Sequence, residues 1–323
     1  MQLPKGTPAA YAARPMSSAA DVLTTRTATI PDELQLWRFT MAGTLYVCAT
    51  PIGNLDDMTF RVIKCLQSVD VIAAEDTRNS IKLLNHFEIK TPMTAYHEFN
   101  KYDKARALVQ DMLAGKNVAI ITDAGTPCVS DPGEELVRQA VEAGITVTSL
   151  PGPVAAVTAL TISGLPTRRF AFEAFLPTEK ANKKERQRIL EELRTETRTM
   201  ILYEAPHKLR VTLQDLADVL GSERRISLCR ELTKRHEEAI RTTLGAAIAL
   251  YQEEDPLGEY VLVIEGRSPE SITEEAQANW NTMPLAEHMQ HYLDQGMSEK
   301  DAMKAVAKDR GVSKRDIYNE LKT

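Results

Sequence analysis

Five short runs of β-branched and other apolar residues recur along the first half of this chain, each followed by a stretch with helical spacing. We expect strands at Leu45–Ala49, Val69–Ala74, Met93–Tyr96, Val118–Thr122 and Ile145–Leu150. They begin roughly 25 residues apart, which leaves room for one helix between consecutive strands. Units of this kind build a mainly parallel sheet, because each helix returns the chain to the same edge. The sequence therefore predicts an α/β fold.

The second half of the chain also mixes helices and strands. We expect helices at Lys180–Thr195 and His207–Leu220, and strands at Thr199–Tyr203, Arg225–Cys229 and Tyr260–Glu265. A single hydrophobic core seldom serves as many as 323 residues. We therefore expect two α/β lobes, 41–165 with a mainly parallel sheet and 166–267 with a mixed sheet.

The sequence pattern changes in the last part of the chain, after the second lobe. Pro269 and its acidic neighbours predict a linker over 268–281, and the apolar spacing of 282–323 is helical throughout. We expect Ser298 to cap one helix, Gly311 to end it and Ser313 to cap another. The positions expected to face inward are Ala302, Met303, Val306 and Ala307 in the first helix and Ile317, Tyr318 and Leu321 in the second. This spacing is typical of a helix-turn-helix unit.

Residues 1–40 are rich in Ala, Thr, Ser and Pro and show no sustained apolar period, which predicts a disordered N-terminal extension. Arg14, Arg26 and Arg38 faintly resemble a transit peptide, but an Arg-rich amphipathic helix is missing. A second Met at position 41 stands just before the first expected strand. We expect the folded protein to begin there.

Composition narrows the class of protein. The chain is 43% hydrophobic, and its longest nearly apolar run, Pro153–Leu165, is too short to cross a bilayer. The four cysteines show no C-x-x-C spacing, so we expect no metal site and a reduced, cytoplasmic setting. The net charge of -6 argues against nucleic-acid binding by the whole surface but leaves room for a local basic patch.

Four loops that follow the expected strands of the first lobe have unusual sequences. They are Thr50–Asp57, Glu75–Arg78, Asp123–Gly133 and Pro151–Pro153. Ligands of parallel sheets bind outside the carboxyl ends of the strands, where these loops meet. Gly53 and Gly125 would let the backbone approach a ligand, and the prolines stiffen the loops. One such loop could be a plain turn, but four at one edge predict a nucleotide-like ligand bound mostly by backbone groups.

Known nucleotide fingerprints are missing from these loops. Gly53 has no second glycine at the spacing of G-x-G-x-x-G, and neither a P-loop nor a G-x-S-x-G turn occurs. Glu75 could hydrogen-bond a ribose, or it could pair with Arg78 or favour the start of the next helix. A dinucleotide-binding protein is therefore disfavoured.

Several segments together are similar to a known group of enzymes. They are Leu45–Val47, Thr50–Leu55, Ala74–Arg78, His97–Glu98, Asp123–Pro127, Ser130–Gly133, Leu150–Pro153, Tyr203–Lys208 and Gly258–Gly266. In kind and order they resemble the tetrapyrrole-methylase-like superfamily of S-adenosylmethionine methyltransferases, and within it the 16S ribosomal RNA cytidine 2'-O-methyltransferases. The resemblance runs from about Met41 to the C-terminus.

The resemblance implies a fold, a cofactor and a reaction. Two α/β lobes would clasp S-adenosylmethionine between them, and the protein would be a homodimer. The expected reaction is methyl transfer to the ribose 2'-hydroxyl of a decoding-centre cytidine, in 16S rRNA or in the small ribosomal subunit. The cofactor residues implied are Pro51, Gly53, Asp123, Ala124, Gly125, Thr126, Val129, Ser130, Pro153, Ala155, Ala156, Tyr203, Glu204 and Ala205. Ala124–Pro127 stands where the porphyrin-methylating branch resembles Gly-Gly-Asp-Pro, which favours RNA as the substrate.

A sugar hydroxyl is a weak nucleophile, so a nearby base would help the transfer. The candidates are Asp123, Asp131, Glu75, His97 and Glu204. Each also has a structural interpretation: Asp131 could cap the helix that begins near Gly133, Asp123 could hold its own loop, and His97 could pair with Glu98. The sequence does not rank these candidates, although Asp123 lies in the most tightly specified loop.

Two basic segments are candidates for contact with RNA. Lys180, Lys183, Lys184 and Arg186 gather on the expected helix 180–195, although Glu185, Glu191 and Glu192 would equally suit a solvated helix. Lys314 and Arg315 would lie on the first turn of the last helix, where helix-turn-helix proteins meet nucleic acid. The alternative for this module is a small bundle that only packs on the enzyme.

Two other functions stay open at this point. One is a methyltransferase of the same fold that acts on a tetrapyrrole or a protein side chain. The other is a non-catalytic RNA-binding factor that retains the cofactor cleft. Cofactor binding and the methylation state of 16S rRNA would separate the three.

Overall fold

The computed structural model describes residues 42–177 and 182–322. The expected extension 1–40 and the expected RNA contact Lys180 lie outside the described residues. Within the described residues, no helix is long and apolar enough to cross a membrane.

The first sheet consists of β1 (Thr44–Cys48), β2 (Val71–Ala74), β3 (Met93–Ala95), β4 (Val118–Ile121) and β5 (Thr146–Leu150), in the order β3-β2-β4-β1-β5. Every pairing is parallel. The five strands expected from the sequence are thus confirmed, with ends that differ by one or two residues. Their carboxyl ends share one edge, which brings the loops after β1, β2 and β4 together.

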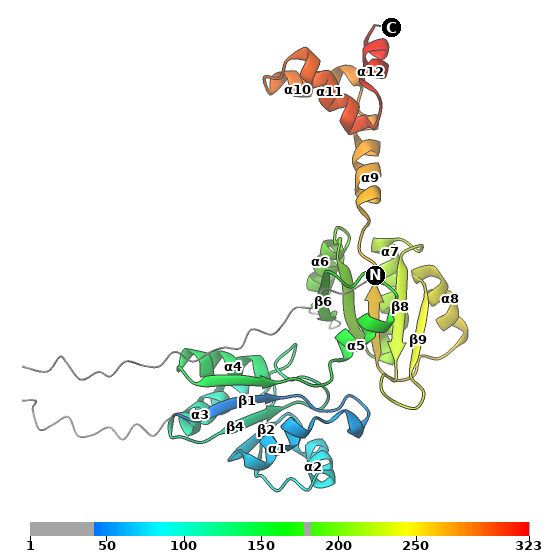
Figure 1. The fold of residues 1–323 in the computed structure, drawn as a ribbon. Helices are drawn as coiled ribbons and strands as arrows, with labels where there is room; N and C mark the ends of the chain where they lie inside the picture. Colours follow the sequence, from blue (N-terminus) through cyan, green and yellow to red (C-terminus); the bar gives the residue numbers. More distant parts are fainter. Residues whose placement is uncertain (1–41, 178–181, 323) are drawn as a thin grey trace, which may run out of the picture. The chain divides into compact units, whose positions relative to one another are not determined.

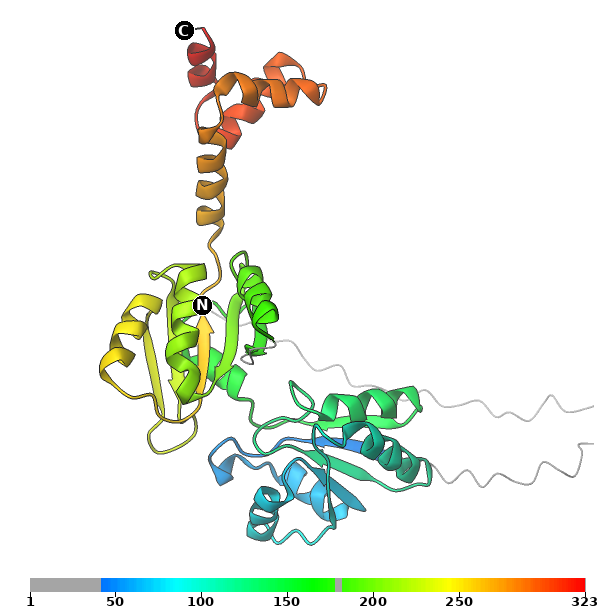
Figure 2. The ribbon, with the colours of Figure 1, turned by 180° about the vertical axis from the view of Figure 1, so that it is seen from behind.

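Helices cover both faces of this sheet. In Figures 1 and 2, α1 (Phe60–Ser68) and α2 (Thr77–His86) lie on one face, and α3 (Lys101–Leu113) and α4 (Gly133–Glu142) on the other. Residues of β4 alternate between the two cores: Val118 and Ile120 pack with α3 and α4, Ala119 and Ile121 with α1 and α2. Burial on both sides explains why the inner strands β2 and β4 are apolar throughout rather than alternating.

The second sheet is mixed, as expected. It has the order β6-β7-β10-β8-β9, with β6 (Phe170–Phe175) parallel to β7 (Thr199–Glu204). β10 (Tyr260–Ile264) runs antiparallel to β7 and to β8 (Arg225–Arg230), and β8 runs antiparallel to β9 (Glu238–Thr243). A core built on α6 (Lys183–Leu193), α7 (Leu209–Leu220) and α8 (Leu244–Glu253) covers one face.

The other face of the second sheet packs against α5 (Ala155–Ile162). Ala156, Ala159 and Leu160 of this helix are buried with Ile201 of β7 and Val263 of β10. The helix therefore belongs by its contacts to the second sheet, although it directly follows the last strand of the first.

In the two lobes, the sequence did not predict β6, β9, α5 and α8. The two strands lie at the edges of their sheet, and the residues of β9 are at most partly buried, so β9 lacks a strong apolar pattern. Both helices are apolar nearly all round, which removes the helical period on which sequence reasoning depends.

The last four helices are α9 (Pro269–Thr282), α10 (Leu285–Asp294), α11 (Glu299–Arg310) and α12 (Lys314–Leu321). The segment 268–281, expected as a linker, is helical. Ser268 accepts a hydrogen bond from the Ser271 backbone amide, and Pro269 occupies the first turn, where its missing N–H costs nothing. Proline therefore marks a helix start here and not a break.

The expected caps of the final two helices are confirmed. Ser298 caps α11, Gly311 ends it in the left-handed conformation, and Ser313 forms a capping box with Asp316. The expected inward face of α12 is correct for Ile317, which is 1% exposed, but wrong for Tyr318 and Leu321, which are 46% and 40% exposed. With only eight residues, α12 buries a single position against α10 and α11.

Candidate functional site

The loops after β1 and β4 are held to each other by the backbone. The Thr50 amide donates to the Gly125 carbonyl over 2.8 Å, and the Gly125 amide donates to the Thr50 carbonyl over 3.1 Å. Gly125 has a φ of +82°, and a Cβ on it would lie 3.2 Å from Cγ2 of Ile52. Residues with a side chain seldom adopt this φ, and their Cβ would crowd Ile52. Glycine is therefore favoured at position 125.

Two carboxylates join these loops to the loop after β2. Asp123 accepts hydrogen bonds from the Asp76 amide over 3.2 Å and from Nδ2 of Asn79 over 3.4 Å. Glu75 accepts a hydrogen bond from the Thr122 hydroxyl over 2.7 Å. Two structural interpretations were thus wrong: Asp123 fastens the neighbouring loop rather than its own, and Arg78 pairs with Asp76 instead of Glu75.

Asp131 holds a strained turn. Its two carboxylate oxygens accept from the backbone amides of Cys128, over 2.8 Å, and Gly133, over 2.7 Å. Cys128 and Ser130 have φ values of 69° and 61°, which non-glycine residues seldom adopt. Burial raises the pKa of the Asp131 carboxyl, and its backbone hydrogen bonds oppose the rise. The interpretation of Asp131 as the cap of α4 was wrong in position, because the capping residue is Pro132; Asp131 precedes it and binds the amide of Gly133, the first residue of the helix.

Val129 lies at the top of this turn, between the two strained residues, and its side chain is 55% exposed. Ala124 and Ser130 are also exposed. An apolar side chain held outward on a rigid turn suits contact with a flat ligand.

The next loop joins the first sheet to α5. The Thr126 hydroxyl donates to the Pro153 carbonyl over 3.1 Å. The Ala156 amide, at the start of α5, donates over 3.2 Å to the phenolic oxygen of Tyr203 on β7. Burial raises the pKa of the Tyr203 phenol. Two hydrogen bonds, joined by the short segment from Pro153 to Ala156, therefore connect candidate residues of the loop after β4 with α5 and β7.

Glu204 and His97 have different surroundings from those expected. Glu204 is 2% exposed and accepts from the Thr212 hydroxyl and the Ala205 amide, so its carboxylate is engaged inside the second lobe. Glu98 pairs with Lys101 over 2.6 Å, and the interpretation of His97 and Glu98 as an interfacial pair stays a prediction. Nδ1 of His97 is buried without a hydrogen-bond partner.

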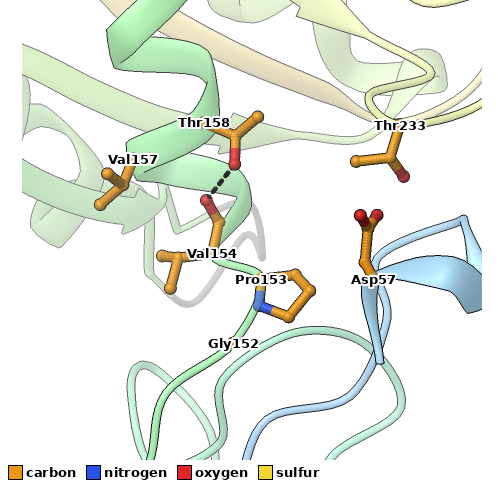
Figure 3. Close-up of a pocket in the computed structure, with 7 residues that line it drawn as sticks. All are labelled: Asp57, Gly152, Pro153, Val154, Val157, Thr158 and Thr233. Atoms are coloured by element: carbon orange, nitrogen blue, oxygen red, sulfur yellow. Dashed lines mark hydrogen bonds between the residues drawn. The ribbon is translucent and has the colours of Figure 1, made fainter. Parts of the chain in front are cut away.

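A cavity of about 430 Å³ lies beside Pro153 (Figure 3). The Asp57 carboxylate enters it from the loop after β1, and Thr233 enters it from the loop between β8 and β9. Oδ2 of Asp57 and Oγ1 of Thr233 are buried and have no hydrogen-bond partner. Val154 and Val157 give the wall an apolar part.

Sequence reasoning missed both of these polar residues. Asp57 closes the loop Thr50–Asp57, which was singled out, but nothing distinguished its carboxylate from that of Asp56. Thr233 precedes β9, a strand that was not expected. The signal that could have found it is the local run of Thr233, Lys234, Arg235 and His236, a basic loop in an acidic protein.

The expected RNA contacts on α6 divide into two kinds. Arg186 is turned inward: its side chain is 12% exposed and pairs with Asp215 over 2.7 Å. Lys183 and Lys184 are exposed. Arg188 pairs with Glu185 and Glu192, as the solvated-helix interpretation anticipated. On the first turn of α12, Arg315 is exposed and Lys314 is half-buried.

We searched the side chains of residues 42–177 and 182–322 for a metal centre and found none. Among them, no group of three or more His, Cys, Asp or Glu is placed to hold a metal ion.

Comparison with known proteins gives consistent matches. Residues 44–248 match the sequence profile of the Tetrapyrrole (Corrin/Porphyrin) Methylases. A protein of Halalkalibacterium halodurans named ribosomal RNA small subunit methyltransferase I is 49% identical over 86% of this chain and 94% of its own length. Proteins of the same name from Bacillus subtilis and Escherichia coli O157:H7 are 46% and 42% identical, over 86% and 85% of this chain and 93% of each relative.

Solved structures agree on the fold. Diphthine synthase superposes with a TM-score of 0.56 at 11% identity, over 70% of this chain and 90% of its own. The methyltransferase CobJ superposes with a TM-score of 0.52 at 20% identity, over 70% of this chain and 95% of its own. The two-sheet architecture is therefore shared with enzymes whose sequences have diverged far.

Proposed function

Because the chain belongs to the tetrapyrrole methylase family and, within it, to the family of ribosomal RNA small subunit methyltransferase I, we propose that it methylates 16S rRNA with S-adenosylmethionine. The acceptor we propose is the ribose 2'-hydroxyl of a decoding-centre cytidine. The substrate that we propose is either 16S rRNA or the assembled small ribosomal subunit. We also propose that the active form of the enzyme is a homodimer.

The proposal rests on one observation: hydrogen bonds join the loops that follow the strands of the first sheet. The paired backbones of Thr50 and Gly125, the carboxylate of Asp123 and the bond from Thr126 to Pro153 fix four loops at one sheet edge. Such a rigid edge binds a ligand with little loss of conformational freedom. It corresponds to the position at which parallel sheets bind nucleotides.

The residues fit S-adenosylmethionine by their chemistry. Gly125 lets the loops after β1 and β4 pair closely, and exposed Ala124 and Val129 offer apolar contact for an adenine ring. Pro51, Gly53, Ser130, Ala155 and Ala205 would complete the binding surface. The cofactor, when bound, supplies a methyl group on a sulfonium, which is a good leaving group.

The protein therefore has to align the acceptor hydroxyl with the methyl carbon and receive its proton. Among the residues considered as bases, Asp123, Asp131 and Glu204 each accept two hydrogen bonds from this chain. The Glu75 carboxylate accepts one, from Thr122, and Nδ1 of His97 has no partner. The bonds of Asp123 are long, at 3.2 and 3.4 Å, so Asp123 stays a candidate with Glu75 and His97. The basic residues Lys183, Lys184, Lys314 and Arg315 would bind phosphates.

The test is the methylation state of 16S rRNA from cells that lack the gene. Mass spectrometry of nuclease fragments should show one decoding-centre cytidine without its ribose methyl group, and return of the methyl group when the gene is restored. An unchanged pattern would contradict the proposal and favour a tetrapyrrole or protein substrate. Calorimetry with S-adenosylmethionine would then separate an enzyme from a non-catalytic RNA-binding factor.

A further inference from the structure

We propose that Asp57 and Thr233 hold the ribose of the acceptor nucleotide, and that Asp57 receives the proton of the 2'-hydroxyl. This inference rests on the proposed function and identifies residues for it that the sequence had not suggested. The juxtaposition of two unpartnered polar atoms in one cavity is the observation behind it (Figure 3).

Both atoms need a partner that the chain does not provide. Oδ2 of Asp57 and Oγ1 of Thr233 are buried, and neither makes a hydrogen bond. Only Asp57, His97 and Thr233 have such atoms among the described side chains, and two of the three line this one cavity. Buried polar groups without partners are unfavourable in a folded protein, and where they persist they mark sites for water or a ligand.

The chemistry of the two atoms selects the ligand. A carboxylate oxygen accepts a hydrogen bond, and a threonine hydroxyl both donates and accepts. A ribose with neighbouring 2'- and 3'-hydroxyls satisfies both at once. The cavity volume of about 430 Å³ lies within the range of small-molecule sites, and Val154 and Val157 provide the apolar contact a sugar or base ring requires.

The loop that carries Thr233 is suited to the rest of a nucleotide. Arg235, which is exposed two positions after Thr233, is a candidate for contact with the phosphate of the bound nucleotide. The loop also contacts the loop that carries Asp57, because a Cβ on Gly53 would lie 2.8 Å from Cγ of Lys234. Gly53 thus lets the two loops approach each other.

Backbone strain supports a functional role for this loop. Glu231 and Thr233 have φ values of 51° and 66°, and neither is glycine. Lys234 pairs with Glu231 over 2.9 Å, and the Thr233 amide donates to the Glu237 carboxylate over 2.7 Å. These contacts hold Thr233 in an unfavourable conformation, which is characteristic of residues that must face a ligand.

The chemical step follows from this position. As the 2'-oxygen forms its bond to the methyl carbon, the proton it carried passes to Oδ2 of Asp57. The electron pair of the broken carbon–sulfur bond stays on the sulfur. Asp57 then returns the proton to solvent when the product leaves.

The test compares two acceptors in the absence of cofactor. Small-subunit particles are reconstituted with 16S rRNA that carries either cytidine or 2'-deoxycytidine at the acceptor position, and their affinity for the full-length protein is measured. A hydrogen bond to a charged acceptor changes affinity by about tenfold or more. We expect the wild-type protein to prefer the ribose particle by that factor, and Asp57→Asn and Thr233→Val to lose most of the preference.

Asp56→Asn is the matched control, since Asp56 is exposed on the same short helix, Leu55–Asp57. It should keep the preference. Calorimetry with S-adenosylmethionine should give the wild-type affinity for Asp57→Asn, which also shows that the variant is folded. In single-turnover methylation, Asp57→Asn should be slowed at least tenfold and Asp57→Glu should recover part of the rate.

Two outcomes would overturn the inference. If Asp57→Asn keeps both the ribose preference and the methylation rate, the cavity does not hold the acceptor. If it instead loses affinity for S-adenosylmethionine, the carboxylate binds the cofactor. Wild-type protein that transfers no methyl group to ribose would overturn the proposed function as well, whereas failure confined to the Asp57 variants would leave that function standing.

Discussion

The backbone amide of Ala156 donates a hydrogen bond of 3.2 Å to the phenolic oxygen of Tyr203. This bond fixes the start of α5 against the end of β7, and Phe172 and Phe175 hold the Tyr203 ring in edge-to-face contacts at 5.0 and 5.5 Å. The ring is thus positioned by aromatic packing, and the hydroxyl alone supports the helix start.

Replacing Tyr203 by Phe separates these two roles. Tyr203→Phe keeps the aromatic packing and leaves the Ala156 amide without its acceptor, at a cost of about 1 kcal/mol in the free energy of unfolding. We expect S-adenosylmethionine affinity to fall severalfold, measured by calorimetry. Tyr102→Phe, at an exposed position, is the control and should change neither quantity. Unchanged affinity in Tyr203→Phe would show that the start of α5 does not contact the cofactor.

Gly125 is predicted to be essential for cofactor binding. Gly125→Val places a branched side chain where φ is +82° and where even a Cβ would lie 3.2 Å from Ile52. Loss of measurable S-adenosylmethionine binding is expected in calorimetry. Gly144→Val serves as a control for backbone strain alone, since Gly144 has a φ of +73° with nothing within 4 Å of an added Cβ. Equal loss of binding in both variants would attribute the effect to strain instead of to the site.

The last helix is predicted to contribute to RNA affinity. Lys314→Ala combined with Arg315→Ala should weaken binding to small-subunit particles and reduce the slope of log affinity against log salt by roughly 0.7–0.9 per lost phosphate contact. Cofactor affinity should stay unchanged. Lys304→Ala, in which the lost amine pairs with Asp301 on α11, is the matched control. A salt slope equal to that of wild type would mean that the terminal helices do not touch RNA.

The terminal helices are predicted to lose stability in acid through His288. Its ring is buried, stacks on Trp280 at 4.1 Å, accepts from Nε of Arg310 at Nδ1 and faces Asp309 at Nε2. Burial lowers the pKa of His288, and the hydrogen bond to Asp309 opposes this. Protonation at Nδ1 would set an N–H against the Arg310 N–H.

Since the folded pKa is lowered, the unfolded state takes up the proton first. Stability is therefore fully present above the unfolded value of about 6.5 and falls as the pH drops below it. Trp280 fluorescence, in a Trp37→Phe background, should report a lower melting temperature for these helices at pH 5.5 than at pH 7.5. His288→Gln should reduce the difference and exposed His86→Gln should not. A pH-independent transition in the unmodified histidine background would refute the prediction.

The inner strands of the first sheet were predictable because they are buried on both faces, so they appear as plain apolar runs such as Val118–Ile121. Gly125 and Asp123 could be proposed from the sequence for a related reason: loops at the carboxyl edge are local in sequence. Asp57 and Thr233 were not found, since their shared cavity depends on a tertiary approach between distant loops. Arg186 was assigned to RNA from charge alone, and only its burial against Asp215 reveals its structural use.

The pairing of Thr50 with Gly125 joins residues 75 positions apart. During synthesis, the first of these loops therefore emerges long before its partner, and it cannot take its bound shape until β4 has docked beside β1. Contacts of such long range form slowly, because the intervening chain must be ordered first. A chain interrupted before Gly125 would leave the backbone of Thr50 without both of its hydrogen bonds, so the loop Thr50–Asp57 would lack the contact that fixes it.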